Sequence, residues 1–281
     1  MNKKYVGKRP EKPLGKQSYL DLTGEVAVVT GGRGNLGSEF CRALHEHGAR
    51  VASIDIKPNT LDSSDPSVRE FTCDITNKTG VQELFSKIID AIGTPTILVN
   101  CAGLDSPPTK SSETTGLFED ISEETWDSII DSHLKGAFLV SQEFIRAARR
   151  AKQDHGSIIN ISSIYGVVTP DQSIYDFMRK GGTPFFKPVA YSVAKSGMLN
   201  FTRWLAEYGA PHHIRVNTLV LGGVFNNQPK EFIIEYNKRT PLGRMARKDE
   251  YNGAILFLAS PRASSYVTGS MLVADGGWTA R

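Results

Sequence analysis

The sequence predicts an α/β protein in which helices cover both faces of a parallel sheet. Short, continuously apolar runs recur along the chain, and such runs are typical of strands that are buried on both sides. Segments with the periodicity of amphipathic helices alternate with them, as a parallel sheet requires. The 281 residues are 40% hydrophobic and 22% charged, a globular balance, and they contain no repeat and no linker. We therefore expect one domain.

The expected elements follow one another from residue 25 onward. Apolar runs predict strands at 26–29, 51–54, 97–99, 157–161, 215–219 and 271–274. A helix is expected after the first strand, because Phe40 and Leu44 fall on one side. A second helix is expected over 81–92, whose apolar residues fall at i, i+3, i+4, i+7, i+8 and i+11. Ser122, followed by two glutamates, should cap a long helix. Further helices are expected near 190–208 and 249–259.

Charge and cysteine content exclude several classes of protein. The 33 basic and 30 acidic residues give a net charge of +3, and six of the basic residues fall within 1–20, so the rest is too weakly charged to bind nucleic acid. Three widely spaced cysteines without a Cys-x-x-Cys pair argue against a disulfide scaffold and a metal site. No apolar run approaches the roughly 18 residues of a membrane span. We expect a soluble, cytoplasmic protein with no nucleic-acid or membrane partner.

Residues 1–24 form a basic, polar arm that contains glycine and proline. Two interpretations remain open at this point. The arm is either mobile, or it packs on a neighbouring subunit through Tyr19, Leu20 and Leu22. Residues 25–281 then make up the domain.

A glycine-rich turn joins the first strand to the following helix, Thr30-Gly31-Gly32-Arg33-Gly34-Asn35-Leu36-Gly37. Such a turn brings backbone N–H groups and a helix N-terminus against a pyrophosphate. Asp55 lies eighteen residues past Gly37, at the end of the second strand. A carboxylate there accepts hydrogen bonds from the adenosine ribose and repels a 2′-phosphate. The pattern predicts a dinucleotide, NAD in preference to NADP, although Arg33 and Lys57 lie nearby.

Tyr191 and Lys195 are four residues apart on a predicted helix, so they share one face. An ammonium beside a phenol favours the phenolate, which would lower the tyrosine pKa toward the range of a general base. The preceding strand ends in Ser162-Ser163, which could place a hydroxyl near the phenol.

Together these segments resemble the short-chain dehydrogenase/reductase family over residues 25–281. The resemblance implies a single-domain Rossmann fold, that is, a doubly wound parallel sheet of about seven strands with helices on both faces. It also implies hydride transfer between a nicotinamide and a carbonyl/alcohol pair, and a homo-oligomer, either a tetramer or a dimer. The motifs that resemble the family are the Thr30–Gly37 turn, Asp74, Asn100-Cys101-Ala102-Gly103, Ser163-Ile164-Tyr165-Gly166, Tyr191-Ser192-Val193-Ala194-Lys195, Ile214-Arg215-Val216-Asn217 and Asp275-Gly276-Gly277.

The resemblance implies a role for individual residues. Tyr191 would exchange the proton, and Ser163 would hold the substrate oxygen. Lys195 would lower the tyrosine pKa and bind the nicotinamide ribose, and Asp74 would contact adenine. The implied cofactor-binding set, which ends with the backbone that receives the carboxamide, is Gly31, Arg33, Asn35, Leu36, Gly37, Asp55, Asp74, Ile75, Asn100, Ala102, Gly103, Tyr191, Lys195, Gly222 and Val224.

Two departures from the family pattern affect the predicted site. Asn35 replaces the second of three spaced glycines, and asparagine tolerates a left-handed conformation better than other non-glycine residues. His133 stands where the family has an asparagine that helps to hold a proton-relaying water. A histidine with a pKa near neutral can also relay protons, so His133 is a fourth candidate catalytic residue. The alternative is a side chain that only packs.

Ser163 and Tyr191 are 28 residues apart, about twice the spacing common in the family. The additional segment, at about 168–189, either shapes the substrate pocket or is an inert surface insertion. It contains Asp171, Tyr175, Phe177, Met178, Arg179, Phe185 and Phe186.

Three functions remain open. The leading one is an NAD(H)-dependent oxidoreductase that transfers a hydride between nicotinamide and a secondary alcohol or ketone, with a tyrosine as acid/base. The chain looks like members of a bacterial subgroup found with surface-sugar biosynthesis genes, so we expect the substrate to be a sugar or polyol. Polar side chains that could recognise its hydroxyls are those of Asn226, Asn227, Gln228 and Asp171. The alternatives are a carbonyl reductase of apolar ketones or keto-esters and a non-catalytic nucleotide-binding subunit.

Overall fold

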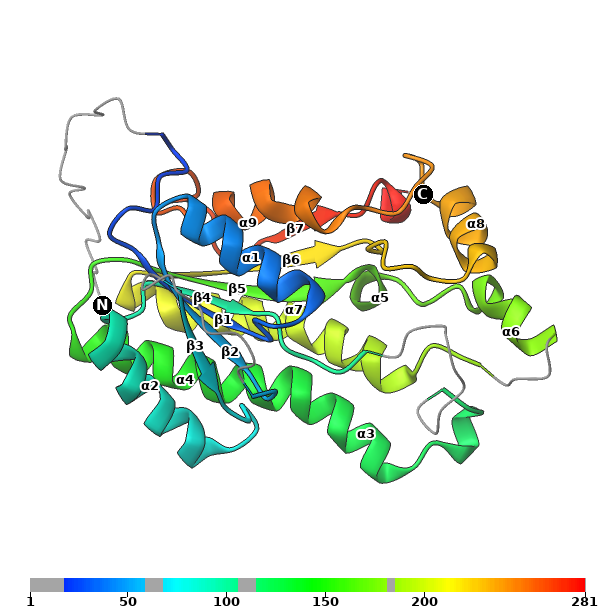
Figure 1. The fold of residues 1–281 in the computed structure, drawn as a ribbon, viewed down its shortest axis with the longest axis horizontal. Coiled ribbons are helices and arrows are strands. Elements are labelled where there is room, and N and C mark those ends of the chain that lie inside the picture. The colour runs from blue at the N-terminus through cyan, green and yellow to red at the C-terminus, as the bar shows by residue number, and fades with distance from the viewer. Residues whose placement is uncertain (1–17, 59–67, 106–114, 181–184, 281) are drawn as a thin grey trace, which may run out of the picture.

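Seven parallel strands form one sheet in the order β3-β2-β1-β4-β5-β6-β7, in a computed structural model that describes residues 18–58, 68–105, 115–180 and 185–280 (Figure 1). The order runs outward from β1 in both directions, as in a doubly wound sheet, so the predicted fold class is confirmed. Each apolar run that predicted a strand lies in one. The strands are β1 (Val26–Thr30), β2 (Arg50–Asp55), β3 (Val68–Thr72), β4 (Ile97–Asn100), β5 (Gly156–Ser163), β6 (Ile214–Leu221) and β7 (Met271–Ala274).

The helices that the hydrophobic pattern predicts are present, one of them divided, and the structure adds helices over Ile164–Val167, Asp176–Lys180 and Lys230–Arg239 that the sequence did not predict. In the described residues they are α1 (Asn35–Glu46), α2 (Lys78–Ile92), α3 (Glu123–Ile130), α4 (Gly136–Arg150), α5 (Ile164–Val167), α6 (Asp176–Lys180), α7 (Val189–Gly209), α8 (Lys230–Arg239) and α9 (Asn252–Ala259). Ser122 caps α3, and its Oγ accepts a hydrogen bond from the N–H of Thr125 at 3.2 Å. The long helix expected from Ser122 is divided by a π-helical turn, Asp131–Lys135, which contains the buried His133. Such turns are frequent at functional sites.

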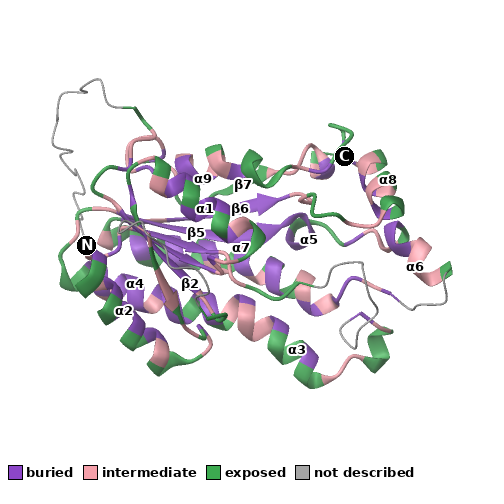
Figure 2. Cartoon of the chain, viewed as in Figure 1, coloured by how far each residue is buried: buried purple, intermediate pink, exposed green. Residues whose placement is uncertain are grey.

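Alternate residues of the central strands point to opposite faces of the sheet. In β1, Val26 and Val28 join the apolar cluster on one face, whereas Ala27 and Val29 join the cluster on the other. Helices α2, α4 and α7 pack on the first face, and α1 and α9 pack on the second (Figure 1). Figure 2 shows that the central strands are buried as a result, which explains why their sequences are continuously apolar. Within the described chain, no helix is both long and apolar enough to cross a membrane.

The last residues of the N-terminal arm, 18–24, pack on the domain itself. Leu22 is fully buried in the cluster that includes α1 and α9, and its N–H donates to the carbonyl of His47 at 2.8 Å. The expectation that Leu22 contacts a neighbouring subunit is therefore wrong, because its side chain is already enclosed by its own chain. Residues 1–17, which hold the basic side chains of the arm, lie outside the described residues.

The segment at about 168–189 is built into the fold and is not an inert surface insertion. Tyr175 and Phe185 are at most 2% exposed, and their ring centroids lie 4.8 Å apart. Both belong to an apolar cluster that also includes Phe232 of α8. Residues 181–184 lie outside the described part of the chain. The insertion therefore joins α8 in a small second core beside the carboxyl ends of the strands.

Candidate active site

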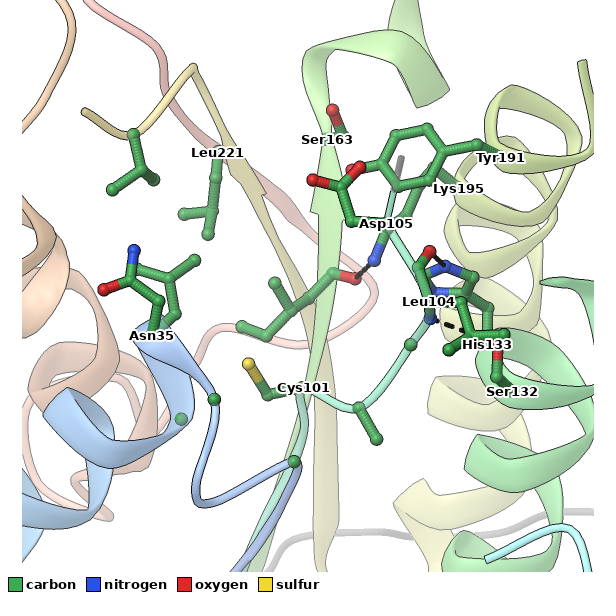
Figure 3. A pocket seen from close by; sticks show the side chains of 18 of the residues that line it. Asn35, Cys101, Leu104, Asp105, Ser132, His133, Ser163, Tyr191, Lys195 and Leu221 are labelled. Atoms are coloured by element: carbon green, nitrogen blue, oxygen red, sulfur yellow. Dashed lines mark hydrogen bonds between the residues drawn. The ribbon is translucent and has the colours of Figure 1, made fainter. Parts of the chain in front are cut away.

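A pocket of about 870 Å³ opens along the carboxyl ends of the strands (Figure 3). The segments that follow β1, β2, β4, β5 and β6 meet there, because parallel strands end at one edge of their sheet. Two of the predicted residues, Arg33 and Asn100, do not line it. Those that do are Gly31, Asn35, Leu36, Gly37, Asp55, Asp74, Ile75, Ala102, Gly103, His133, Ser163, Tyr191, Lys195, Gly222 and Val224.

The glycine turn after β1 fits closely against the segment after β4. The Oγ1 of Thr30 accepts hydrogen bonds from the N–H groups of Cys101 and Ala102 at 3.1 and 3.2 Å. A Cβ on Gly31, whose φ is +67°, would lie 2.9 Å from the Cα of Ala102. A Cβ on Gly37 would lie 2.0 Å from the carbonyl oxygen of Gly31. The turn therefore needs glycine at both positions, and it leaves the start of α1 close to the pocket.

Asn35 does not use the left-handed conformation considered from the sequence. It is the first residue of α1, and the residue before it, Gly34, has φ −75° and ψ 169°. The non-glycine residues of the described chain with positive φ are Lys152, His213 and Asn227. An ordinary helix start replaces the glycine conformation here, with the Asn35 side chain exposed at the pocket.

Asp55 is fixed at the end of β2 by the backbone around it. Its Oδ2 accepts a hydrogen bond from the N–H of Arg33 at 3.0 Å, and its Oδ1 accepts one from the N–H of Lys57 at 3.1 Å. The Arg33 guanidinium pairs with Glu70 at 3.1 Å and also donates to the carbonyl of Lys57. Arg33 thus neutralises a second carboxylate, which explains why it does not line the pocket as predicted.

The side chain of Asn100 belongs to a buried polar network and not to the pocket. Its Nδ2 donates to the Oδ1 of Asn160 at 2.8 Å and to the Oγ of Ser141 at 3.1 Å. Asn160 in turn donates to the Oγ1 of Thr202 at 2.8 Å. Asn100 therefore connects β4 to α4 and β5, and its side chain does not line the pocket in which a cofactor contact was expected.

Ser163, Tyr191 and Lys195 meet at the end of β5, as predicted (Figure 3). Ser163 is the last residue of β5, and its Oγ accepts a hydrogen bond from the N–H of Tyr165 at 3.2 Å. The other two residues are one turn apart on α7, and the Nζ of Lys195 donates to the carbonyl of Ile161 at 3.0 Å. A Cβ on Gly166 would lie 2.6 Å from the Lys195 backbone, so glycine permits the close packing of α5 on α7.

Burial governs the charge states of these groups. Loss of hydration lowers the pKa of Lys195 to about 8. Loss of hydration also raises the pKa of Tyr191 well above its ordinary range, and the Asp105 carboxylate raises it further, whereas the hydrogen bond with Ser163 opposes the change. The net pKa of Tyr191 is therefore not lowered in this arrangement, in contrast to the expectation from the sequence. The Nζ of Lys195 lies 5.7 Å from the ring centroid, and desolvation has the larger effect.

His133 packs between Gly103 and Tyr191. A Cβ on Gly103 would lie 2.0 Å from the imidazole, and the rings of His133 and Tyr191 meet edge to face at 5.5 Å. Its Nε2 donates to the carbonyl of Leu104 at 2.9 Å, and its Nδ1 has no hydrogen-bond partner in the described chain. Burial, followed by the charge of Lys195, lowers the pKa of His133 to about 3. The expected near-neutral pKa is wrong, and the ring is a neutral acceptor.

Asp105 and Lys187 are two pocket residues that the sequence did not single out. The Nζ of Lys187 lies 2.5 Å from the Oδ1 of Asp105 and 4.5 Å from the centroid of the Tyr191 ring. The two residues are 82 positions apart, and neither belongs to a family motif, so the fold alone brings them together. The one available signal was the position of Lys187, four residues before the tyrosine.

Polar residues expected to recognise substrate hydroxyls divide into two groups. Asn226 and Gln228 line the pocket. Asp171 instead accepts a hydrogen bond from the Nε of Arg239 in α8 at 2.5 Å, and Asn227 occupies a left-handed loop position with φ +54°. Among the described residues, no three His, Cys, Asp or Glu side chains are grouped so that they could hold a metal ion.

Comparison with known proteins defines the class of enzyme. A family model described as "Enoyl-(Acyl carrier protein) reductase" matches residues 31–279. That span contains residues 31–37 of the glycine turn, the Ser163–Tyr191–Lys195 group and the six strands β2 to β7. The chain belongs to the short-chain dehydrogenase/reductase family, and it is an oxidoreductase with a small-molecule substrate.

Individual relatives cover almost the whole chain. The 3-oxoacyl-[acyl-carrier-protein] reductase of Thermotoga maritima is 30% identical over 92% of this chain and 99% of its own. The 2-dehydro-3-deoxy-D-gluconate 5-dehydrogenase of Escherichia coli is 30% identical over 94% of this chain and 99% of its own. A short chain dehydrogenase from Leptospira borgpetersenii, solved with bound NAD⁺, is 33% identical with a TM-score of 0.83, and the match covers 96% of this chain and 99% of that one. Members of this family use a nicotinamide cofactor.

Proposed function

We propose that the protein is an NAD(H)-dependent oxidoreductase that transfers a hydride between nicotinamide and a secondary alcohol or its ketone, with Tyr191 as acid/base. The continuity of the pocket supports this proposal most directly. The pocket runs from the glycine turn after β1 to Tyr191 and Lys195 on α7, so a dinucleotide and a substrate can share it.

The residues along the pocket fit a nicotinamide dinucleotide. The start of α1 lines the pocket, where its N–H groups can meet a pyrophosphate, and Asp55 offers a carboxylate to the adenosine ribose. When bound, the nicotinamide supplies or accepts the hydride. The Ser163 hydroxyl holds the substrate oxygen, and the Tyr191 hydroxyl gives it a proton or takes one from it. The Lys195 ammonium stabilises the phenolate that forms and binds the nicotinamide ribose.

We assign a supporting role to His133. Its neutral ring presents Nδ1 as an acceptor without a partner in the described chain, and a buried acceptor of this kind is satisfied by an ordered water. A water held there extends the hydrogen-bonded path from Lys195. The ring contributes an acceptor atom, as the amide oxygen of an asparagine would, and it does not change charge near neutral pH.

Charge around Asp55 supports NAD in preference to NADP. The Asp55 carboxylate lines the pocket and repels a phosphate. Arg33 is the nearby cation best suited to bind a 2′-phosphate, but its guanidinium pairs with Glu70. The positive charge of Arg33, which in the sequence argued against a preference for NAD, is therefore offset by the Glu70 carboxylate.

We propose a sugar or polyol as the substrate. Polar groups of Asn226 and Gln228 line the substrate end of the pocket. The Escherichia coli relative is named for a sugar-acid substrate, whereas the Thermotoga relative is named for an acyl substrate. The second candidate, a reductase of apolar ketones, is supported by the rings of Tyr175, Phe232 and Tyr236, which line the same end.

We also propose a cytoplasmic homo-oligomer, either a tetramer or a dimer. Helices α4 and α7 expose Phe138 (46%), Trp204 (63%) and Tyr208 (45%), and the last two rings stack at 5.5 Å. Exposed aromatic groups of this kind mark association surfaces, and we assign this one to a second copy of the chain. Analytical ultracentrifugation tests the assignment, because Trp204→Glu should shift the wild-type oligomer toward smaller species.

The direct test of the function is NADH absorbance during incubation with NAD⁺ and pooled sugars, polyols and apolar alcohols. We expect NADH to form with the polyhydroxy pool and to vanish in Tyr191→Phe. Formation with apolar alcohols alone would favour the second candidate. Binding of NADH without turnover of any pool would favour the non-catalytic subunit.

A further inference from the structure

The ion pair between Lys187 and Asp105 has no role in the hydride transfer proposed above. The Lys187 side chain is 8% exposed and the Asp105 side chain is 61% exposed, and both line the pocket. Burying a lysine ammonium costs free energy that a carboxylate partner only partly repays, so such pairs are weak devices for stability. Their presence in a pocket is more readily explained by a ligand.

The pair lies next to the reacting groups. The Nζ of Lys187 is 4.5 Å from the centroid of the Tyr191 ring. The Asp105 carboxylate is close enough to act on the same phenol, since its charge raises the pKa of Tyr191 (Figure 3). A substrate whose oxygen is held by Tyr191 and Ser163 therefore has its neighbouring carbon atoms within reach of both charged groups.

The insertion holds Lys187 in place through its backbone. The N–H of Lys187 donates to the Oε1 of Gln172 at 3.0 Å, and the Nε2 of Gln172 donates to the carbonyl of Lys187 at 3.3 Å. The adjacent Asp171 is in turn fixed to Arg239 of α8 at 2.5 Å. The ammonium is thus presented by an anchored segment, and preorganised groups of this kind lose little entropy when a ligand binds.

The chemistry of the pair matches hydroxyl groups. A carboxylate accepts hydrogen bonds from hydroxyls, and an ammonium donates to hydroxyl oxygens, so together they satisfy both sides of one or two neighbouring hydroxyls. A substrate carboxylate would face repulsion from Asp105. An apolar ketone would cover both charged groups and displace water from them without offering either one a hydrogen bond, which is costly. The pair therefore favours a neutral polyhydroxy compound.

We propose that Lys187 and Asp105 form a specificity site that recognises a hydroxyl on the carbon next to the reacting one, so that the enzyme prefers vicinal diols and the corresponding hydroxyketones. This inference rests on the proposed function, because it takes the Tyr191 hydroxyl as the partner of the reacting oxygen.

A matched pair of alcohols tests the proposal. The ratio of kcat/KM for cis-1,2-cyclohexanediol to kcat/KM for cyclohexanol, measured with NAD⁺, isolates the contribution of one hydroxyl. Any effect of a substitution on the reactivity of Tyr191 applies to both alcohols and therefore cancels in this ratio. We expect the wild-type enzyme to favour the diol by about tenfold or more, as a hydrogen bond to a charged group allows, and Lys187→Met and Asp105→Asn each to reduce the preference to about threefold or less.

Lys238→Met provides the control. Lys238 also pairs with a carboxylate, that of Glu235 at 2.6 Å, but it lies on the exposed side of α8 and does not line the pocket. Its ratio should equal that of the wild type. Unchanged NAD⁺ affinity and circular dichroism in Lys187→Met and Asp105→Asn would show that these variants are folded.

Two further readouts separate the possible results. A wild-type ratio near one, or a ratio unchanged in both variants, overturns the proposal. A preference for gluconate over sorbitol that depends on Lys187 and increases in Asp105→Asn also overturns it, because Lys187 would then bind a carboxylate. If no alcohol is oxidised, the proposed function fails. The affinities of cyclohexanol and cis-1,2-cyclohexanediol for NAD⁺-loaded Tyr191→Phe, measured by calorimetry, then still decide whether Lys187 and Asp105 select the diol.

Discussion

The two ends of the pocket are assembled in different ways. At the cofactor end, the turn at Thr30–Gly37 and the carboxylate of Asp55 come from consecutive elements, β1, α1 and β2. At the substrate end, Asp105 follows β4, His133 lies in a π-helical turn, and Lys187 comes from the insertion. The first end is a local motif made largely of backbone. The second is a meeting of buried side chains from distant segments, and its charge states depend on packing.

This difference indicates where substrate selection resides. The cofactor end is the general dinucleotide-binding motif, which needs a few glycines and one carboxylate and does not depend on the substrate. The substrate end contains two departures from the family pattern, His133 and the insertion, whereas the departure at the cofactor end, Asn35, starts an ordinary helix. We expect substitutions at the cofactor end to change cofactor affinity and substitutions at the substrate end to change the rate of turnover. The following variants test that separation.

The largest effect is expected for Tyr191→Phe, at the boundary between the two ends. Removing the transferred proton should lower kcat by about 10³-fold, within the range of general acid–base contributions, and should leave the NAD⁺ affinity unchanged. Stopped-flow rates and fluorescence titration measure the two quantities. Tyr175→Phe, at another pocket-lining tyrosine, should retain more than about a tenth of the activity. A Tyr191→Phe variant with the wild-type rate would remove the proposed mechanism.

The burial of Lys195 should be visible in stability. Because the folded-state pKa is about 8 and the ordinary value is 10.5, the unfolded chain binds more protons between these values. Lys195 therefore opposes folding below pH 8, and this cost decreases by about 2 kcal/mol as the pH rises from 7.5 to 9.5. Cysteines act oppositely in the same range, since desolvation raises the pKa of Cys101 to about 11.

The Lys195 contribution is measured as a difference. Urea unfolding of the wild type and of Lys195→Met at pH 7.5 and 9.5 should give a gap in unfolding free energy that narrows or changes sign with pH. The variant lacks the titrating group, whereas Cys41, whose pKa Lys195 does not affect, contributes equally in both proteins. A gap that stays constant would show that Lys195 is hydrated in the folded protein.

A smaller effect is expected at the cofactor end. Asp55→Ala should weaken NADH binding about tenfold, the value of a hydrogen bond to a charged group, and should reduce the discrimination against NADPH. Glu70→Gln is the companion variant to Asp55→Ala. It frees the Arg33 guanidinium from its carboxylate partner, so it should strengthen NADPH binding without weakening NADH binding. Fluorescence titrations with both cofactors give these affinities. An unchanged cofactor preference in both variants would contradict the assignment of the ribose site.

The smallest effect is expected for His133→Asn. Both side chains offer a neutral acceptor, so kcat should change by no more than about threefold, as for a water-mediated contact. His133→Leu removes the acceptor and should cost about tenfold. The pH profiles of kcat should coincide in all three proteins between pH 6 and 8, because the imidazole does not titrate there. A profile that moves with His133→Asn would show that the histidine carries a proton itself.

The sequence predicted the cofactor end well because its signals are local. Gly31 has a positive φ and Gly37 packs against the carbonyl of Gly31, both within one turn, and Asp55 is placed by the end of a strand that is recognisable from its apolar run. Arg33 and Asn100 lie in the same motifs, but their side chains are taken by Glu70 and by Asn160. Spacing along the chain contains no information about such partners.

The substrate end was less predictable because burial decides its chemistry. His133 was identified as a departure from the family, yet its low pKa depends on burial between Gly103 and Tyr191 and on the charge of Lys195. The ion pair of Lys187 and Asp105 needs a tertiary contact between segments 82 residues apart. Desolvation and long-range pairing follow from the finished fold, and no sequence periodicity encodes them.

The π-helical turn Asp131–Lys135 contains His133, and it also sets the rotation of the following helix, α4, about its axis. A π turn holds one residue more than an α-helical turn, and each residue of an α-helix rotates the chain by about 100°. Deleting a residue there would rotate α4 by that angle against α3, so that Phe144, now fully buried, would turn out of the core. Shortening the turn to move His133 would therefore also misplace the apolar face of α4, and evolution can change the residue at this position more easily than the length of the helix.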